Sequence, residues 1–286
     1  MNETISINEV VQMAKSIPCS PLILPRLMAL LNNPDEADAK HIQAIIIKDA
    51  SLVSMVLRMA NSSYFSNSAQ CSSVSEAVVR LGFREVYRIT VGSVAGRWLK
   101  NSNKGYGWEP GDLCKHSLCV AVATEYLAKG SNKVDSGLAY TAGLLHDVGK
   151  LALAHACAEQ FELVRARQAE LRISWRQAEH DILGYDHTDV GGALMESWSY
   201  PPNLIQVARY YPRPKLSAEE FRSLVVHVHA GKHIALSLGY GVGEEGFSTE
   251  LDEESLKEEG FTAELLEKSL PPVLEGSNKL ITGAFS

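Results

Sequence analysis

The sequence predicts an all-α fold, and three observations support this prediction. Apolar residues recur at intervals of three and four along most of the chain, while the alternation typical of a half-buried strand is rare. Polar residues that can cap a helix precede several of these segments, and Gly or Pro ends several of them. Hydrophobic residues make up 45% of the 286 residues, which is enough for a sizeable core. We expect a two-part helical bundle with a boundary in the polar linker 101–110.

The N-terminal part, residues 1–100, is predicted to hold short amphipathic helices. A helix at 38–48 carries Ile42, Ile45 and Ile46 on one face, and Asp49 can cap the helix that follows. The other helices of this part are expected at 7–16, from Pro25 to Leu31, from Ser75 to Gly82, and from Phe83 to about Leu99. We expect their apolar stripes to form core.

The second part, residues 108–240, is predicted to form a larger helical core. Its helices are expected at about 112–129, 137–147, 174–183, 187–198, 202–210 and 217–238. Capping boxes at Ser174 and Ser217 predict where two of these helices begin. The remainder, 241–286, is predicted to be an acidic tail with solvated charges and one docking helix that contains Leu265, Leu266, Leu270 and Val273. Its last ten residues are expected to be loose.

Charge and cysteine usage indicate a cytoplasmic protein without a broad nucleic-acid surface. The net charge is -7, whereas phosphate binding needs clustered Lys and Arg. The five cysteines are odd in number and lack a CxxC spacing, which is typical of reduced thiols. Cys114 and Cys119 are expected to be buried apolar residues rather than ligands. The N-terminus shows no signal peptide, and the apolar run 44–47 is too short to cross a membrane.

A helix-turn-helix that reads DNA is an alternative for the two helices joined at Gly82. The arginines available to it are Arg80, Arg84, Arg88 and Arg97. They are isolated and partly balanced by Glu76 and Glu85, which disfavours this alternative.

Three histidines and one aspartate lie on or at the end of successive predicted helices: His116, His146, Asp147 and His187. Imidazole and carboxylate ligands together suit Fe, Mn, Zn or Ni, and helical bundles build metal sites from facing side chains. Gly149 permits a tight backbone after the His-Asp pair, and Lys150 can contact an anion. The spacing alone leaves open whether this set binds a metal or consists of hydrogen-bonded core residues.

This set resembles the motif of the HD phosphohydrolase superfamily, in which a histidine precedes a His-Asp pair and a later aspartate. The stretch His146-Asp147-Val148-Gly149-Lys150 is also similar to the HD-GYP branch, the cyclic-di-GMP phosphodiesterases. That branch has a histidine like His187 with a glycine four residues later, as at Gly191. The resemblance implies an HD-like core in which a metal activates water and Lys150 holds a phosphate.

Two places depart from the pattern of these enzymes. The His-His pair of the HD-GYP branch falls on Tyr211 and Pro212, neither of which is an ordinary ligand. The later aspartate of the superfamily, three residues after His229, is replaced by Lys232. A lysine ammonium has no lone pair to give and would repel a cation. His227, His229 and His233 are the alternative ligands, but Lys232 would still weaken the site.

The N-terminal part resembles the HDOD domain, an all-helical relative of the HD enzymes. The resemblance rests on Lys48-Asp49-Ala50-Ser51-Leu52, on residues 57–65 and 74–82, and on the stretch from Asp186 to Pro201, and it covers about residues 10–240. HDOD domains occur in bacterial signalling and regulatory proteins and mostly lack demonstrated catalysis. The resemblance therefore implies an HD-like C-terminal core packed on an N-terminal helical subdomain. It also implies a stand-alone module, because no receiver, GGDEF or EAL domain fits in the chain.

Three functions stay open at this point. The first is a regulatory module that binds a signalling protein, which the N-terminal resemblance and the broken ligand set favour. The second is a metal-dependent phosphohydrolase with an unusual ligand shell, which the four retained residues and Lys150 favour. The third is a pocket that binds a nucleotide, another phosphoester or a metal as a signal without turnover.

Overall fold

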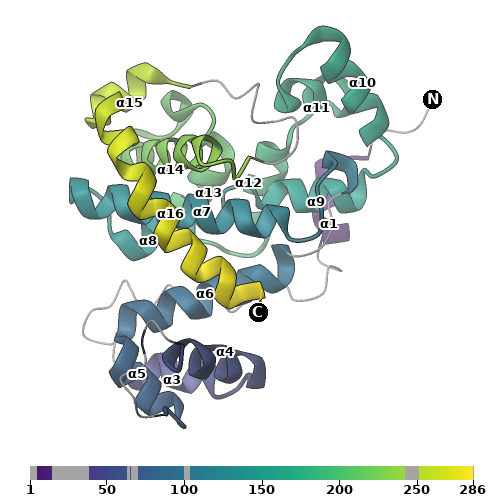
Figure 1. Ribbon diagram of the computed structural model, residues 1–286. Coiled ribbons are helices and arrows are strands. Elements are labelled where there is room, and N and C mark those ends of the chain that lie inside the picture. Colours follow the sequence, from purple (N-terminus) through teal and green to yellow (C-terminus); the bar gives the residue numbers. More distant parts are fainter. Residues whose placement is uncertain are drawn as a thin grey trace.

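The computed structural model describes residues 5–14, 39–62, 65, 70–99, 104–241 and 251–285. These residues form α-helices, short 3-10 helices and the turns between them, with no strand among them (Figure 1). The prediction of an all-α fold is therefore confirmed. The helix expected from Pro25 to Leu31 lies outside the described residues.

Four helices of the N-terminal part pack against one another at the lower end of the molecule in Figure 1. They are α3 (Ala39–Ile46), α4 (Ala50–Ala60), α5 (Val74–Leu81) and α6 (Phe83–Leu99). The Ser73 hydroxyl accepts a hydrogen bond from the backbone N–H of Glu76 and so starts α5, two residues before the predicted Ser75. Gly82 has a φ of 78°, a backbone conformation that favours glycine, and it ends this helix.

The first helix, α1 (Ile7–Ala14), lies with the C-terminal part although the sequence divides the chain near residue 100. It packs against α9 (Val148–Ala156) and α12 (His187–Ser197). The hydroxyl of Tyr185 donates a hydrogen bond to the carbonyl oxygen of Ile5 at 2.5 Å. The first described helix therefore lies on the larger core, whereas α3 to α6 form the smaller helical group.

The centre of the larger core is α7 (Asp112–Ser131), which is buried along most of its length. α8 (Ser136–Leu145) and α14 (Glu219–Ser237) pack on it through glycines. A Cβ on Gly143 would lie 2.8 Å from the Cα of Ala121, and one on Gly231 would clash with the Thr124 side chain. The two glycines therefore let both helices approach α7 more closely than a larger residue would permit.

The other helices of the core surround this centre. They are α10 (Phe161–Leu171), α11 (Trp175–Leu183) and α13 (Pro202–Tyr210), with 3-10 turns at Lys104–Tyr106 and Pro214–Leu216. The sequence did not predict α9 or α10. The Ser174 hydroxyl caps α11 as expected, since it accepts from the backbone N–H of Gln177. The capping box expected at Ser217 is wrong: α14 has Ala218 as its N-cap residue, and the Ser217 hydroxyl donates to the carbonyl of Pro214.

The C-terminal segment forms two helices, α15 (Glu253–Glu259) and α16 (Ala263–Phe285). Asp252 caps α15 by accepting from the backbone N–H of Ser255, so this acidic stretch is helical. α16 runs diagonally across α7 and reaches α4 and α6 (Figure 1). It continues to Phe285, so the expectation that the last ten residues are loose is wrong. The helix is anchored by three of its own side chains that are buried, Leu266, Val273 and Leu280.

Candidate metal centre

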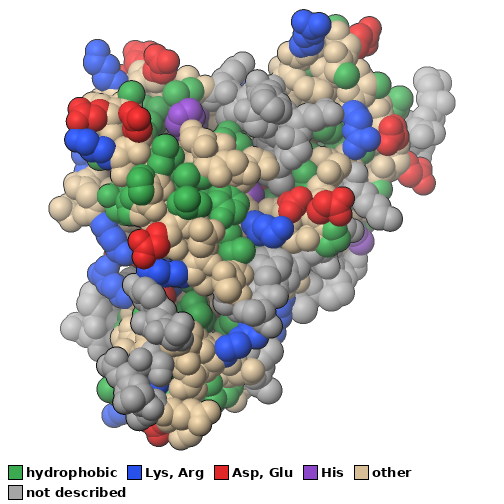
Figure 2. Space-filling model, in the orientation of Figure 1, with side chains coloured by type: hydrophobic (Ala, Val, Ile, Leu, Met, Phe, Trp, Pro, Cys, Tyr) green, Lys and Arg blue, Asp and Glu red, His purple; other side chains and the backbone are tan. Residues whose placement is uncertain are grey.

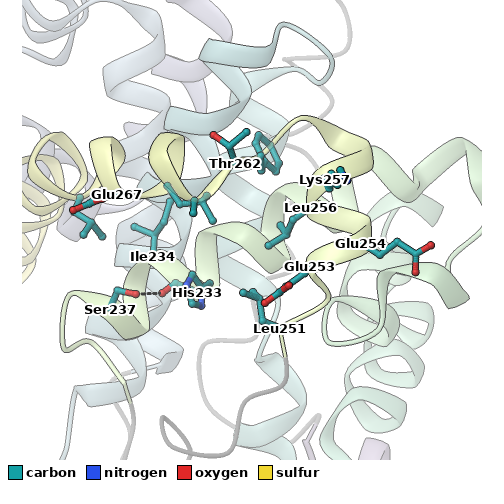
Figure 3. A pocket seen from close by; sticks show the side chains of 14 residues that line it. His233, Ile234, Ser237, Leu251, Glu253, Glu254, Leu256, Lys257, Thr262 and Glu267 are labelled. Carbon is teal, nitrogen blue, oxygen red and sulfur yellow. Dashed lines mark hydrogen bonds between the residues drawn. The ribbon is translucent and has the colours of Figure 1, made fainter.

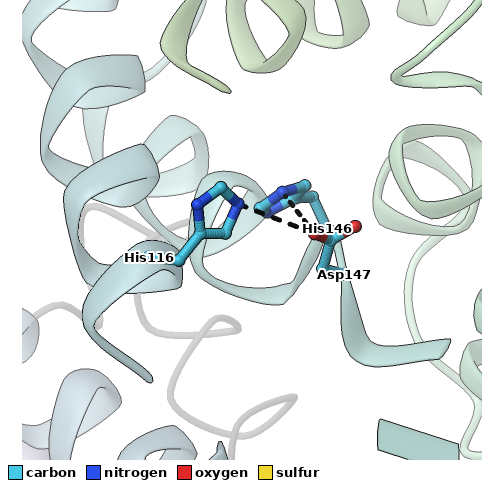
Figure 4. Close-up of side chains that lie close together, drawn as sticks. All are labelled: His116, His146 and Asp147. Carbon is cyan, nitrogen blue, oxygen red and sulfur yellow. Dashed lines mark ion pairs between the residues drawn. The ribbon is translucent and has the colours of Figure 1, made fainter. Parts of the chain in front are cut away.

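The junction between α8 and α9 brings the His-Asp pair to the middle of the larger core. α8 ends at Leu145 and α9 begins at Val148, so His146 and Asp147 form the turn between them. His116 comes from α7 and faces this turn (Figure 4). All three side chains are buried, with 1% of each residue exposed.

The three side chains could offer one ligand atom each to a shared cation. The Nε2 atoms of His116 and His146 lie 3.6 and 3.3 Å from Oδ2 of Asp147, and the three ligand atoms fall within 4.8 Å of one another. Two ligands bound at about 2.0–2.1 Å to one tetrahedral ion lie roughly 3.4 Å apart, so these separations suit a shared ion.

The tautomers of both imidazoles follow from their outer hydrogen bonds. Nδ1 of His116 lies 2.6 Å from the carbonyl oxygen of Tyr240, and Nδ1 of His146 lies 2.7 Å from that of Gly143. A carbonyl only accepts, so each Nδ1 carries the proton, and in the neutral ring each Nε2 presents a lone pair. Neither Nε2 atom has a hydrogen-bond partner. Two buried lone pairs therefore converge beside the Asp147 carboxylate.

The Asp147 carboxylate, however, is already bound by side chains of the chain itself. Lys150 Nζ donates to Oδ2 at 2.7 Å, and the hydroxyl of Tyr211 donates to Oδ1 at 2.5 Å. Lys232 Nζ lies 3.6 Å from Oδ2 and donates to the Tyr211 hydroxyl at 3.2 Å. Lys150 and Lys232 are buried as well. A divalent cation beside Asp147 would therefore meet two ammonium groups at close range.

His187 lies next to this group but bonds to other partners. Its Nδ1 is 2.6 Å from Oε2 of Glu179, and its Nε2 is 3.0 Å from the Tyr211 hydroxyl and 4.0 Å from Oδ1 of Asp147. The Tyr211 hydroxyl gives its proton to Asp147, so Nε2 of His187 must donate to it. Nδ1 also donates, because Glu179 is a carboxylate. Tyr106 extends this series of hydrogen bonds, because its hydroxyl donates to Oε1 of Glu179 at 2.6 Å.

The electrostatics agree with these hydrogen bonds. Burial lowers the pKa of His146 to about 4, so its ring is neutral near pH 7. Burial acts to raise the pKa of Asp147, but the neighbouring His146 and the Lys150 and Lys232 ammonium groups outweigh it and hold this pKa well below its usual range. Burial opposes protonation of His187, yet the Glu179 carboxylate raises the pKa of this imidazole. Asp147 is thus a carboxylate and His187 is paired with Glu179.

The residues of this centre do not fit a catalytic pair of metal ions. His116, His146 and Asp147 could each offer one ligand atom to a single ion, whereas Lys232, with its Nζ 3.6 Å from Oδ2 of Asp147, has no lone pair for a second ion. Lys150, expected to contact a phosphate, instead bonds to Asp147 and lies 5.5 Å from the centre of the Trp108 ring. The structure thus brings together three of the four predicted ligands and turns His187 towards Glu179.

Two histidines of α14, His229 and His227, bond away from the centre. Nδ1 of His229 lies 2.9 Å from the carbonyl of Tyr211, and its Nε2 accepts from the backbone N–H of Asp252 at 3.0 Å. Nε2 of His227 lies 2.8 Å from the Ser131 hydroxyl. These rings therefore do not take over the missing ligand positions. Sequence reasoning missed Glu179 and Tyr106, because only the packing of α11 against α12 brings Glu179 to His187.

The arginines considered for DNA reading are used inside the protein. Arg84 donates to the Ser136 hydroxyl, Arg88 lies 3.0 Å from Glu125, and Arg97 lies 2.8 Å from Asp49. Arg80 donates to the carbonyl of Ala60. Within the described part of the chain, no helix combines the length and the apolar character that a membrane crossing requires.

Comparisons with known proteins bear on the family and the fold of the chain. The HDOD domain family matches residues 17–214. A relative from Treponema pallidum, described as an uncharacterized protein, is 28% identical over 214 residues, which are 73% of this chain and 40% of that protein. The chain thus spans about two fifths of the length of this relative.

Solved structures share the fold. An HDOD domain protein of unknown function from Geobacter sulfurreducens has a TM-score of 0.68 at 22% identity, covering 97% of this chain and 94% of its own. A Marinobacter aquaeolei protein, provisionally named a signal transduction protein, has a TM-score of 0.74 at 25% identity, covering 93% and 58%. A Shewanella amazonensis protein, provisionally named a phosphohydrolase, has a TM-score of 0.70 at 22% identity, covering 96% and 97%.

Proposed function

The chain belongs to the HDOD domain family, and on this premise we propose that it is a regulatory module that binds a signalling protein and does not turn over a phosphoester. The observation that carries this proposal is the state of Asp147. Both of its carboxylate oxygens are engaged by Lys150, Tyr211 and Lys232. The name of the Marinobacter protein, a signal transduction protein, is consistent with this role.

The physical reason is that an ammonium group and a catalytic cation compete for the same carboxylate. Hydrolysis by an HD-type centre needs a cation that lowers the pKa of a bound water. Lys232 supplies positive charge to Asp147 without a coordination position for water, because an ammonium group has only protons to offer. We therefore expect a centre that keeps its packing and hydrogen bonds without activating a water molecule.

The direct test is an assay of the purified protein with bis(p-nitrophenyl) phosphate and with cyclic-di-GMP, in the presence of Mn²⁺, Fe²⁺, Ni²⁺ or Zn²⁺. We expect no turnover above that of an Asp147→Asn variant, which controls for contaminating enzymes. Turnover of about 1 s⁻¹ or faster that is lost in Asp147→Asn would contradict the proposal and favour a metal-dependent phosphohydrolase with a degenerate HD site.

A second experiment restores the missing ligand. Lys232→Asp replaces the ammonium group by a carboxylate beside His116, His146 and Asp147. We expect this variant to retain more Mn²⁺ or Zn²⁺ than the wild type when metal content is measured after dialysis. Lys268→Asp is the matched control, since Lys268 is an exposed lysine on α16. Equal metal content in all three proteins would show that Lys232 does not keep cations out.

A further candidate function is a centre that holds one metal ion as a signal without turnover. The lone pairs of His116 Nε2 and His146 Nε2, which lack partners, favour it. In this case a chelator should lower the melting temperature of the wild type, because an ion bound only by the folded state stabilises it. The melting temperature of His146→Ala should not respond to the chelator.

A further inference from the structure

A groove on the outer face of the C-terminal helices is not part of the metal centre. It has a volume of about 890 Å³ and lies between α14, α15 and α16 (Figure 3). Its apolar lining includes Ile234, Leu256, Phe261 and Leu266, while His233 and Ser237 add polar atoms along α14. Figure 2 shows hydrophobic side chains gathered along the face where Figure 1 places α15 and α16. This volume is in the range of sites that bury a ligand.

The walls of this groove are acidic. Residues 252–268 contain seven acidic residues and two lysines. Glu253, Glu254 and Glu267 line the groove, against one lysine, Lys257. Glu254 pairs with Lys215, while no ion pair within the described part of the chain involves Glu253 or Glu267. The groove therefore favours a positively charged occupant and disfavours nucleotides and other phosphoesters.

The geometry of the groove favours a helix as its occupant. An added β-strand needs an open strand edge to pair with, and the described residues around the groove lie in helices and short connections without a strand among them. A helix satisfies its own backbone and can place an apolar stripe at positions i, i+3, i+4 and i+7 into a trough between helices. Lysine or arginine at the edges of that stripe would then lie beside Glu253 and Glu267.

From the groove lining and its charge, we propose that it binds a basic amphipathic helix of a partner protein. This inference rests on the proposed regulatory function and names the chemistry of the partner.

The groove is also connected to the metal centre, since His233 of the groove follows Lys232 on α14. One turn earlier, His229 joins the carbonyl of Tyr211 to the backbone N–H of Asp252 at the start of α15. A helix seated on α14 and α15 would thus contact the elements that hold Lys232 and Tyr211.

The proposal is tested with a fluorescein-labelled amphipathic peptide of leucine and lysine, about 14 residues or four helical turns long. Its affinity for the full chain is measured by fluorescence anisotropy. A peptide with glutamate in place of lysine keeps the same apolar stripe and serves as the charge control. We expect the lysine peptide to bind with a Kd well below about 1 mM and the glutamate peptide not to bind.

Two variants test whether the lysine peptide binds in the groove. Ser237→Trp fills the groove, and Glu253→Lys with Glu267→Lys reverses the charge of its walls; each should weaken binding at least about tenfold. The matched controls are Ser197→Trp, at the exposed end of α12, and Glu162→Lys with Glu170→Lys on α10, which changes the net charge equally. Both controls should bind the peptide like the wild type. Circular dichroism and melting temperature confirm that each variant is folded.

Three outcomes would overturn this inference. One is no binding of the lysine peptide, and another is an equal loss of binding in the groove variants and their controls. The third is a wild-type dimer that Ser237→Trp converts to a monomer, which would assign the groove to a second copy of the chain. Turnover of a phosphoester would contradict the regulatory function, but it would leave the result of the peptide experiment unchanged, so the two failures are distinguishable.

Discussion

At Asp147, a buried carboxylate is stabilised by hydrogen bonds from Lys150 and Tyr211 rather than by solvent. A charge with this degree of burial is costly unless it is paired and hydrogen-bonded. Lys232 adds a second ammonium group at 3.6 Å, and His187 reaches the same phenol as Lys232. The Tyr211 hydroxyl therefore connects Asp147 and Lys232 with His187.

Tyr211→Phe tests this connection. The substitution removes the hydroxyl that donates to Asp147 and accepts from Lys232 and His187, and leaves buried polar atoms without that partner. We expect the free energy of unfolding to fall by about 1–3 kcal/mol, measured by urea denaturation. Tyr210→Phe is the control, because the neighbouring Tyr210 is half-buried and lies outside the centre. Equal stability of both variants would show that the hydroxyl is not part of a coupled network.

The pH dependence of stability is expected to involve His229. Burial lowers the pKa of His229 below its ordinary value of 6.5, and its Nε2 accepts from the backbone N–H of Asp252. Below about pH 6.5 the unfolded chain binds a proton that folded His229 resists, so stability falls as the pH falls.

His229→Gln removes this titration and keeps an amide that can replace both hydrogen bonds. The melting temperature of the variant, measured from pH 8 to pH 5, should fall less steeply than that of the wild type. A variant curve parallel to that of the wild type would assign the pH dependence to other groups, such as His146 or His227, whose pKa values burial also lowers.

At the scale of elements, the position of the centre depends on the crossing of α9 and α12. A Cβ on Gly149 would clash with the carbonyl oxygen of His187 and would lie 2.6 Å from the backbone nitrogen of Gly191. Both contacts are with backbone, which cannot move aside as a flexible side chain can. The crossing therefore fixes the distance between the turn that carries Asp147 and the first turn of α12.

Gly149→Ala should push these two helices apart. We expect a loss of at least about 1–3 kcal/mol in the free energy of unfolding, typical of overpacking, measured by urea denaturation. Gly130→Ala is the control, since a Cβ at Gly130 in α7 meets nothing within 4 Å. It should be neutral or should stabilise the protein by up to about 1 kcal/mol. Similar stabilities of the two variants would contradict the close crossing.

At the scale of the whole molecule, α16 joins the larger core to the N-terminal helices. It packs mainly on α7 and also contacts α14, α4 and α6. Val273 is 0% exposed on this helix, whereas its neighbour Leu274 is 38% exposed. The C-terminal helix therefore contributes to the folded core and is not merely an appended tail.

Val273→Asp compared with Leu274→Asp tests this role. A carboxylate at the buried position has no partner for its charge, so we expect a loss of more than about 3 kcal/mol in unfolding free energy. Leu274→Asp should change the stability by much less, because its side chain is partly in solvent. Chemical denaturation followed by circular dichroism gives both values. A small effect of Val273→Asp would show that α16 is not docked as described.

Most helices could be predicted because their signals are local. Apolar periodicity and residues such as Gly82 and Ser174 are properties of a few consecutive positions. The predictions of helices and caps failed where local signals are weak or misleading. α9 follows α8 after only two residues, and without a strong signal for a second helix start the prediction ended at residue 147. Ser217 has the sequence of a cap, but its hydroxyl bonds to Pro214. The end of α16 is ordered by burial of Leu280 against distant helices.

The sequence by itself determined the helical class, the resemblance to the HDOD family, the candidate ligands His116, His146, Asp147 and His187, and the presence of Lys232 at the position of an expected aspartate. These conclusions depend on residue type and on spacing along the chain, and the sequence contains both in full. Only the tertiary structure decided that Lys150, Lys232 and Tyr211 meet at Asp147 and that His187 pairs with Glu179. A hydrogen bond needs two groups within about 3 Å, and that distance is set by how helices far apart in the chain pack together.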